Sequence, residues 1–252
     1  MKIRFTKLAA LAAAAMMVMT GFTACGKTTT STSGDADISS ADNAAAETAA
    51  PAADGEILNF NPPAVGEKIA VITVKDYGEI KIKLFPEAAQ KGVENFVELA
   101  EMNYYDELIF HRIIPNFMNQ GGDPTGTGMG GKSIWGDKFD GGIPQGLYHF
   151  SGAVAYANSS GPSTNGSQFY IVNTQDGDYS GIDLSTYPAN VKAMYEEKGG
   201  TPFLDGGYTV FGQVFEGMDV VRAMSQVETD ENDKPLTQVM MESVRIVEYT
   251  GE

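Results

Sequence analysis

The sequence contains very few of the residue types that carry covalent or metal chemistry. It has one cysteine, Cys25, and two histidines, His111 and His149, among 252 residues. A lone cysteine excludes a disulfide within the chain, so packing alone must hold the fold together. Two histidines are too few for a histidine-rich metal centre, and the acidic stretch DGDYSGID lacks the spacing of an EF-hand loop. We therefore expect neither a metal nor a cofactor.

Positive charge is also scarce. The chain has 17 lysines and arginines against 33 aspartates and glutamates, which gives a formal net charge of −16. Phosphates of nucleic acids and anionic lipid headgroups would repel so acidic a protein. Nucleic acid is therefore not an expected partner, and attachment to a membrane would need something other than charge.

The first 25 residues offer such an attachment. A positive segment opens the chain, with Lys2, Arg4 and Lys7. The apolar run Leu8–Met19 follows, which is too short to span a bilayer and is typical of a secretory signal. It leads into FTACG, which resembles a bacterial lipobox, where the cysteine becomes the lipidated first residue. We expect a lipoprotein signal peptide at residues 1–24 and a lipid anchor on Cys25. An ordinary signal peptide with an incidental cysteine is the alternative.

Composition then divides the rest of the chain. Residues 26–54 are mainly Ala, Thr, Ser, Gly and Asp, and Ile38 is their only large apolar residue. Such a segment buries too little apolar surface to offset the entropy of ordering. We predict a disordered, lipid-anchored tether over residues 25–62 and a folded domain over residues 63–252. The protein would sit at the outer face of the bacterial cytoplasmic membrane, or facing the periplasm.

The sequence of the folded part predicts many strands and two helices. KIAVITVKDYGEIKIKLF alternates apolar and polar residues on both sides of DYG, which predicts a β-hairpin. PEAAQKGVENFVELAEM and EGMDVVRAMSQV carry apolar residues at helical spacing. Short apolar runs separated by glycines predict the other strands, and QVMMESVRIVEY closes the chain as a strand. The pattern favours a closed β-barrel with helical caps.

The stretch GTGMGGKS, from Gly126 to Ser133, fits two nucleotide-binding patterns, the phosphate loop and the dinucleotide fingerprint. Both patterns require a helix directly after the glycines, whose amino terminus would bind the phosphate. The chain continues IWGDKFDGGIP, where glycines and a proline prevent a useful helix. We therefore expect no nucleotide partner, and a compact loop in which glycines take positive φ.

Four segments resemble the cyclophilin family of peptidyl-prolyl cis-trans isomerases: FHRIIPNFMNQGGD, GGKSIWGDKF, YANSSGPSTNGSQFYI and FLDGGYTVFGQVFEGMDVV. They occur in the family's order between Lys68 and Tyr249. The resemblance implies a closed, antiparallel, eight-stranded β-barrel capped by two α-helices. It also implies isomerisation of Xaa-Pro bonds in proline-containing polypeptides such as exported client proteins. We expect a monomer.

The resemblance also implies roles for individual residues. Arg112 matches the catalytic arginine of the family. Three side chains match walls of the proline pocket: Phe117, Met118 and Leu204. Four residues match the rim that grips the substrate chain: Gln120, Ala157, Asn158 and Gln168. The chemistry suits such a site, because a catalyst of bond rotation must bind the twisted peptide and needs no nucleophile.

Three further pocket positions depart from the best-known eukaryotic members of the family. Phe203 stands where many have tryptophan, so we expect weakened binding of cyclosporin. Tyr208 replaces a histidine and Tyr170 a phenylalanine, and we expect both to alter the polarity of the pocket. His111 lies inside a family motif and is expected to be packed and hydrogen bonded rather than an acid or base.

An insert at about residues 174–200 is longer than the matching loop of compact cyclophilins. Its segment PANVKAMYEEKGG begins with proline and ends with two glycines, which predicts an extra short helix. The helix would pack on the barrel or, alternatively, flank the proline pocket and select substrates. DGDYSGID within the insert is a weak candidate for calcium.

Two other functions remain open at this point. The chain could be a chaperone or scaffold module that binds proline peptides with little turnover. Arg112 favours the enzyme, because a pure binder has no need of it. A solute-binding lipoprotein is disfavoured because the pattern does not predict two α/β lobes.

Overall fold

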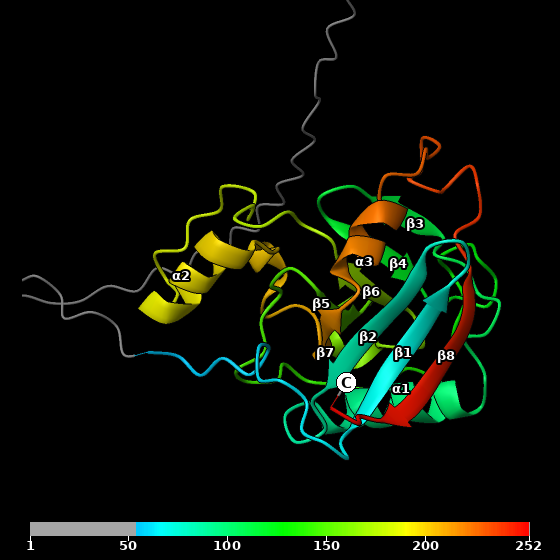
Figure 1. The fold of residues 1–252 in the computed structure, drawn as a ribbon, viewed down its shortest axis with the longest axis horizontal. Helices are drawn as coiled ribbons and strands as arrows, with labels where there is room; N and C mark the ends of the chain where they lie inside the picture. Colours follow the sequence, from blue (N-terminus) through cyan, green and yellow to red (C-terminus); the bar gives the residue numbers. More distant parts are fainter. Residues whose placement is uncertain (1–53, 252) are drawn as a thin grey trace, which may run out of the picture. The chain divides into compact units, whose positions relative to one another are not determined.

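A computed structural model describes residues 54–251. The predicted signal peptide, Cys25 and most of the predicted tether lie outside this range. The described part holds one antiparallel sheet of eight strands in the order β3-β4-β6-β5-β7-β2-β1-β8 (Figure 1). The strands are β1 (Lys68–Val74), β2 (Gly78–Leu84), β3 (Arg112–Ile114), β4 (Met118–Gly121), β5 (Ala153–Tyr156), β6 (Phe169–Val172), β7 (Val210–Glu216) and β8 (Met241–Glu248).

The sheet curls until its two edges approach each other. The segment 107–110, just before β3, pairs with the residues that lead into β8: Phe110 N–H donates to the Val239 carbonyl at 2.8 Å, and Met241 N–H donates to the Leu108 carbonyl at 2.9 Å. The predicted eight-stranded antiparallel cyclophilin fold is therefore confirmed. It is a curled half-barrel whose edges meet through this connecting segment, because β3 has only three residues and cannot form a long ladder with β8.

Strands β1 and β2 form the hairpin that the alternating pattern predicts. Their register pairs Ile72 with Ile80 and Ala70 with Ile82, and all four side chains are fully buried. Residues directly opposite each other in an antiparallel pair share one face of the sheet. The alternation therefore turns one continuous apolar face toward the barrel interior.

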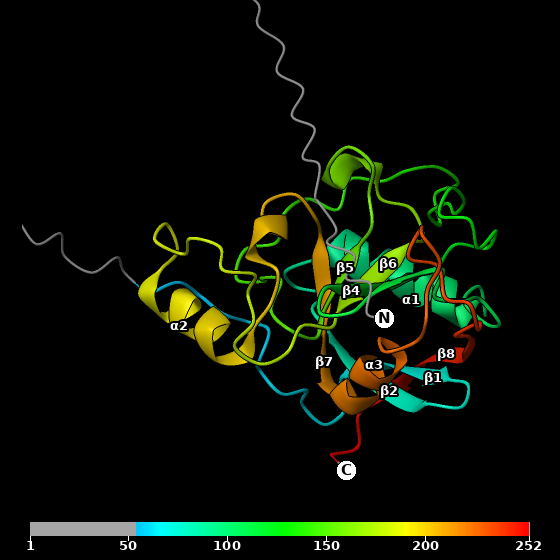
Figure 2. The same cartoon turned by 90° about the horizontal axis from the view of Figure 1, so that it is seen from above.

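Helices α1 (Gln90–Glu101) and α3 (Met218–Met224) lie at opposite ends of the curled sheet (Figures 1 and 2). Helix α1 turns Val93, Phe96 and Leu99 inward. The Phe96 ring packs 5.1 Å from the Phe211 ring and edge-on to Phe169. Each such side chain contributes roughly 1.5–3 kcal/mol through burial. The two predicted capping helices are thus confirmed.

The predicted helix of the insert is α2 (Ala189–Lys198), which lies beside the barrel (yellow in Figures 1 and 2). It begins after Pro188 and ends at Gly199, whose φ is 73°. Its buried side chains join a second, smaller apolar cluster: Phe150, Leu184, Val191 and Tyr195. The insert therefore packs on the domain.

The described chain starts earlier than the predicted domain. Residues 55–60 fall in the segment predicted as tether, yet they lie against the folded part. Gly55 and Asn190 exchange two hydrogen bonds, and Leu58 N–H donates to the Gly146 carbonyl at 2.8 Å. The composition argument covers only residues 26–54, and no periodic apolar pattern marks residues 55–60 as a strand or helix.

Candidate active site

A row of side chains crosses three neighbouring strands on one face of the sheet. Arg112 of β3 pairs with Gln120 of β4, which in turn pairs with Tyr170 of β6. Met118 lies two residues before Gln120 and shares its face, because side chains alternate along a strand. The opposite face carries Ile113, Asn119 and Ile171, which are fully buried. The predicted site residues thus point away from the barrel interior.

Loops around this face complete a small pocket of about 150 Å³. Its lining residues are Arg112, Phe117, Met118, Gln120, Ala157, Asn158, Tyr170, Leu204 and Tyr208. All nine were named from the sequence. Pockets for drug-sized ligands occupy about 300–1,000 Å³. This one is smaller and suits a single five-membered ring better than a nucleotide or cofactor.

Arg112 stands at the edge of the pocket with its side chain 41% exposed. Its Nε lies 3.4 Å from Oδ2 of Asp233, whose side chain is similarly exposed. An ion pair so accessible to water contributes little energy. It engages one of the five donors of a permanently charged guanidinium. Sequence reasoning missed Asp233, which lies 121 residues further along the chain.

Gln168 and Phe203 lie just outside the pocket. Gln120 donates to Gln168 at 2.9 Å, and Gln168 donates to the carbonyls of Gly128 and Gly130. Gln168 therefore holds the rim residue Gln120 in place. Phe203 is 49% exposed, and its ring lies 5.6 Å from the ring of the pocket residue Phe117.

Asn158 is engaged by its own loop. Its side-chain amide donates to the Gly207 carbonyl at 3.1 Å, and its oxygen accepts from Gly161 N–H at 2.9 Å. These bonds join the loop after β5 to the loop before β7, which brings Tyr208 to the pocket. The Asn158 side chain therefore fixes the conformation of the two loops that form this part of the rim.

Tyr170 adds an apolar ring to the pocket rather than a free hydroxyl. The residue is 4% exposed, and its hydroxyl lies 3.0 Å from Nε2 of His149. Burial raises the pKa of the Tyr170 phenol well above its ordinary value. The hydroxyl that was expected to alter the polarity of the pocket is therefore engaged by His149.

The glycine loop next to the site binds an anion that belongs to the protein itself. The buried carboxylate of Asp123 accepts from the amides of Thr125, Gly128 and Gly130 at 2.8, 2.6 and 3.2 Å. Burial raises the pKa of Asp123, but these hydrogen bonds outweigh it and hold the pKa below its usual value. The amides that a phosphate would need are thus occupied. The predicted positive φ is found at Gly126, Gly128 and Gly131.

Two hollows adjoin the pocket. One, of about 280 Å³, shares Gln120, Ala157 and Asn158 with it and extends along the glycine loop. The other, of about 630 Å³, shares Arg112 and Gln120 and is bordered by Asp230 and Lys234. The two hollows also share Gln120 and Gly128 with each other, so the pocket opens onto one continuous depression along the glycine loop.

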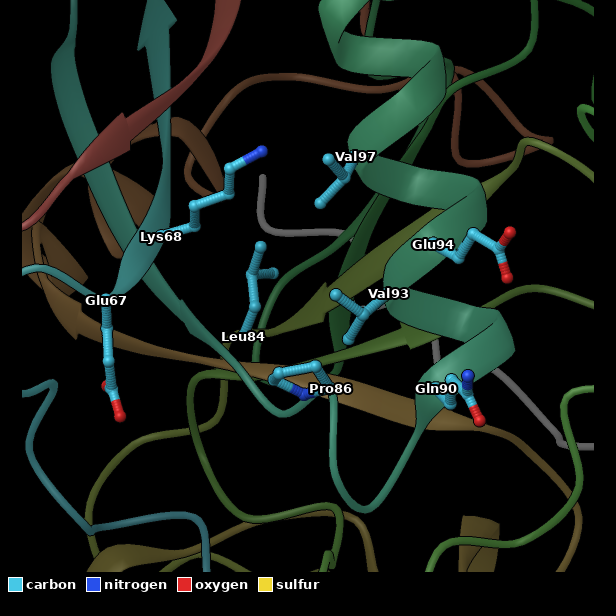
Figure 3. Close-up of a pocket in the computed structure, with 8 residues that line it drawn as sticks. All are labelled: Glu67, Lys68, Leu84, Pro86, Gln90, Val93, Glu94 and Val97. Carbon is cyan, nitrogen blue, oxygen red and sulfur yellow. The ribbon is translucent and has the colours of Figure 1, made fainter.

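A further hollow of about 410 Å³ lies away from this site, between α1 and the first two strands (Figure 3). Val93 and Val97 of α1 face Leu84, and charged side chains stand at its rim. It has no histidine, hydroxyl or thiol among its lining residues. Within residues 54–251, no group of three metal-binding side chains gathers closely enough to hold an ion.

His111 precedes Arg112 and is 6% exposed, so its predicted packing is confirmed. The predicted hydrogen bond is wrong: neither ring nitrogen has a partner in the described part of the chain. Burial lowers the pKa of His111, and the Asp123 charge offsets this only in part, while Lys234 and Arg112 lower it further. The imidazole is therefore held neutral beside the cationic site residue.

Comparison with known proteins agrees with this geometry. The sequence model of the family described as "Cyclophilin type peptidyl-prolyl cis-trans isomerase/CLD" matches residues 69–246. A Staphylococcus aureus (strain COL) protein named for peptidyl-prolyl cis-trans isomerase activity is 43% identical over 184 residues, which cover 72% of this chain and 93% of that protein. A Streptococcus pyogenes protein named as a bifunctional phosphatase/peptidyl-prolyl cis-trans isomerase is 45% identical, but the match spans only 39% of its length.

Solved structures give the same result. The crystal structure of a Cryptosporidium parvum cyclophilin type peptidyl-prolyl cis-trans isomerase, determined in the presence of the dipeptide Ala-Pro, aligns with a TM-score of 0.58 and 31% identity. The alignment covers 72% of this chain and 99% of that one. Family model, relatives and fold agree, and the chain belongs to the cyclophilin-type peptidyl-prolyl cis-trans isomerases.

Proposed function

We propose that this isomerase accelerates the folding of exported proteins at the cell envelope, held there by a lipid on Cys25. The positive segment, the short apolar run and the lone cysteine at its end support export and lipidation. None of the helices in residues 54–251 has the length and apolar character needed to cross a bilayer.

The reaction needs binding and no bond cleavage. Rotation about a peptide bond has a barrier of about 18–20 kcal/mol, because the nitrogen lone pair is delocalised into the carbonyl. An Xaa-Pro bond therefore isomerises unaided in tens to hundreds of seconds. An enzyme accelerates the rotation by binding the twisted bond more tightly than either planar isomer.

In the proposed site, the proline ring sits between Phe117, Met118, Leu204 and Tyr170. Arg112 at the pocket edge donates to the proline nitrogen, which gains a localised lone pair only when the bond twists. The interaction is therefore stronger in the transition state than in the ground state, as catalysis requires. Neighbouring residues of the substrate chain lie in the adjoining hollows. The observation that supports this best is the small pocket with the arginine at its edge.

The test replaces that arginine. We expect Arg112→Ala to fold normally and to lower kcat/KM for an Xaa-Pro peptide by about 100-fold or more, because a preorganised donor contributes a few kcal/mol. Protease-coupled isomerisation measures this. The matched control is Arg245→Ala, which removes a surface arginine paired with Asp106 outside the pocket. Turnover unchanged by Arg112→Ala would contradict the assignment. A wild-type protein that binds proline peptides without turnover would favour a chaperone or scaffold.

The anchor is tested separately. We expect Cys25→Ser to move the protein from the membrane fraction to the soluble fraction, because the variant lacks the thiol to which the lipid would be attached. Incorporation of a labelled fatty acid into the wild type and not into the variant measures the modification itself. If the variant stays membrane-bound and unlabelled like the wild type, the proposed lipoprotein form is rejected.

A further inference from the structure

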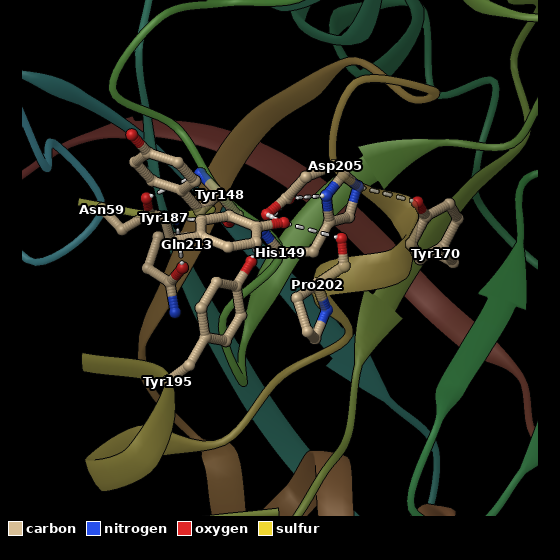
Figure 4. A network of polar contacts seen from close by, with 9 residues as sticks. All are labelled: Asn59, Tyr148, His149, Tyr170, Tyr187, Tyr195, Pro202, Asp205 and Gln213. Atoms are coloured by element: carbon tan, nitrogen blue, oxygen red, sulfur yellow. Dashed lines mark hydrogen bonds and ion pairs between the residues drawn. The ribbon is translucent and has the colours of Figure 1, made fainter. Parts of the chain in front are cut away.

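Asp205 joins the insert to the back of the proline pocket. It directly follows the short 3-10 turn η2 (Pro202–Leu204), which carries the pocket-wall residue Leu204. Figure 4 shows side chains from three separate segments converging on its carboxylate. The Asp205 side chain is 15% exposed, so these contacts are largely shielded from water.

One carboxylate oxygen of Asp205 binds side chains of the insert. Oδ2 of Asp205 accepts from the hydroxyl of Tyr195 at 2.6 Å and lies 2.9 Å from the hydroxyl of Tyr187. The Tyr187 hydroxyl also lies 3.0 Å from the carbonyl of Pro202, in the same turn. Burial, then the Asp205 charge, raises the pKa of both tyrosines far above their ordinary value, so they remain hydrogen-bond donors. Bonds to a charged acceptor are stronger than bonds between neutral groups.

The other carboxylate oxygen of Asp205 binds His149, which lies behind the pocket residue Tyr170. Oδ1 of Asp205 accepts from the backbone N–H of His149 at 2.9 Å and lies 2.6 Å from its Nδ1. A carboxylate only accepts, so Nδ1 carries a proton. The other ring nitrogen, Nε2, lies 3.0 Å from the hydroxyl of Tyr170. His149 is 1% exposed, so its ring has little room to turn.

The contacts form one chain of bonds that ends at two walls of the pocket. It runs from Tyr187 and Tyr195 through Asp205, and from there to Leu204 by the backbone and to Tyr170 by way of His149. No residue of the 174–200 insert lines the pocket itself. Any influence of the insert on the substrate must therefore act through the residues it holds.

We propose that Asp205 is a positioning residue of the proline pocket, through which Tyr187 and Tyr195 of the insert fix the Leu204 and Tyr170 walls. The inference rests on the proposed isomerase site. It assigns the insert a role in the fit of the proline ring, in addition to its packing.

The test removes two hydroxyls and leaves the rings. In the full-length protein, we expect Tyr187→Phe/Tyr195→Phe to raise KM for an Ala-Pro-containing peptide about three- to tenfold, because the walls lose bonds to a charged group. We expect kcat to change by less than about twofold, since Arg112 is untouched. Tyr148→Phe is the matched control: Tyr148 packs in the same apolar cluster, and its hydroxyl is not among the groups bonded to Asp205.

A second variant covers the case in which the double variant does not fold. Asp205→Asn keeps the shape of the side chain but removes its charge, and we expect KM to rise in the same direction. A lower melting temperature with KM unchanged in both variants would mean that the network only stabilises the fold, and would overturn the inference. Absence of turnover in the wild type would instead reject the proposed isomerase site, so the two failures are distinguishable.

Discussion

At the residue scale, His111 and Arg112 are neighbours in sequence with opposite environments. Side chains of adjacent residues in extended chain point to opposite sides. Arg112 is 41% exposed at the pocket edge, whereas His111 is 6% exposed and lies beneath the glycine loop. The nearest atom to a side chain added at Gly128 would be Nε2 of His111, at 3.6 Å. Arg112 supplies the cation of the site, and His111 fills the space under the glycine loop that borders the site.

The neutral state of His111 leads to a prediction about acid stability. Its pKa in the folded protein is lowered by burial, whereas in the unfolded chain it is about 6.5. As pH falls below about 6.5, the unfolded chain therefore binds the proton more readily, and the free energy of unfolding decreases. The stabilisation that comes from the neutral His111 is therefore fully present above about pH 6.5 and is lost as the pH falls. Between pH 7.5 and 5.5, the free energy of unfolding decreases by no more than ~1.4 kcal/mol for a single such group.

His111→Phe removes the titrating group and keeps a planar ring. We expect its free energy of unfolding to change less than that of the wild type between pH 7.5 and 5.5, as measured by urea denaturation. The carboxylates with lowered pKa, such as Asp123, affect stability only at lower pH. Equal pH dependence of the two proteins would show that the His111 imidazole accepts its proton as easily when folded as when unfolded.

At the element scale, the glycine loop shows what a motif leaves undetermined. GTGMGGKS has glycines at the spacing of a phosphate-binding loop, and the structure does turn its amides toward an oxyanion. That oxyanion is Asp123, three residues before the first glycine of the stretch. A side chain added at Gly130 would lie 2.3 Å from Oδ1 of Asp123, so the glycine permits the close wrap. The pattern encodes the geometry of the loop but not the source of its anion.

The same limit explains which elements could be predicted. The β1–β2 hairpin and α1 follow from apolar periodicity, and α2 follows from Pro188 and Gly199 at its ends, because these signals are local. The pocket residues were found through resemblance to a family. The Asp205 network could not be found in this way. His149 lies 56 residues from Asp205 and 21 from Tyr170. Periodicity indicates that a residue is buried, but it does not identify the partner of a buried polar group.

At the scale of the whole molecule, the described chain has two apolar clusters of unequal size. The larger fills the barrel, and the smaller gathers around Phe150, Tyr195 and their neighbours between α2 and the sheet. The segment 55–60 spans both regions. Ile57 packs on the smaller cluster, and the Phe60 ring lies 5.2 Å from the ring of Phe150. The segment thus fastens the insert to the barrel.

Asn59 is a buried residue of this segment with several hydrogen bonds to the folded part. It is 2% exposed, and its amide donates to the Tyr148 carbonyl at 3.0 Å and to Oε1 of Gln213 at 2.9 Å. Its oxygen accepts from the Tyr148 N–H at 3.0 Å. These partners are 89 and 154 residues away. Loss of the side chain would leave buried groups without partners, which costs about 1–3 kcal/mol per group.

We therefore expect Asn59→Ala to lower the free energy of unfolding by about 2–4 kcal/mol and the melting temperature by roughly 5–10 °C, measured by thermal denaturation. Asn61→Ala is the matched control, because Asn61 is exposed two residues further on and should melt within about 1–2 °C of the wild type. A large difference between the two variants would place the start of the folded domain near residue 55 and shorten the predicted tether accordingly. Equal melting temperatures would mean that residues 55–60 are held weakly, and the boundary would return to the predicted residue 63.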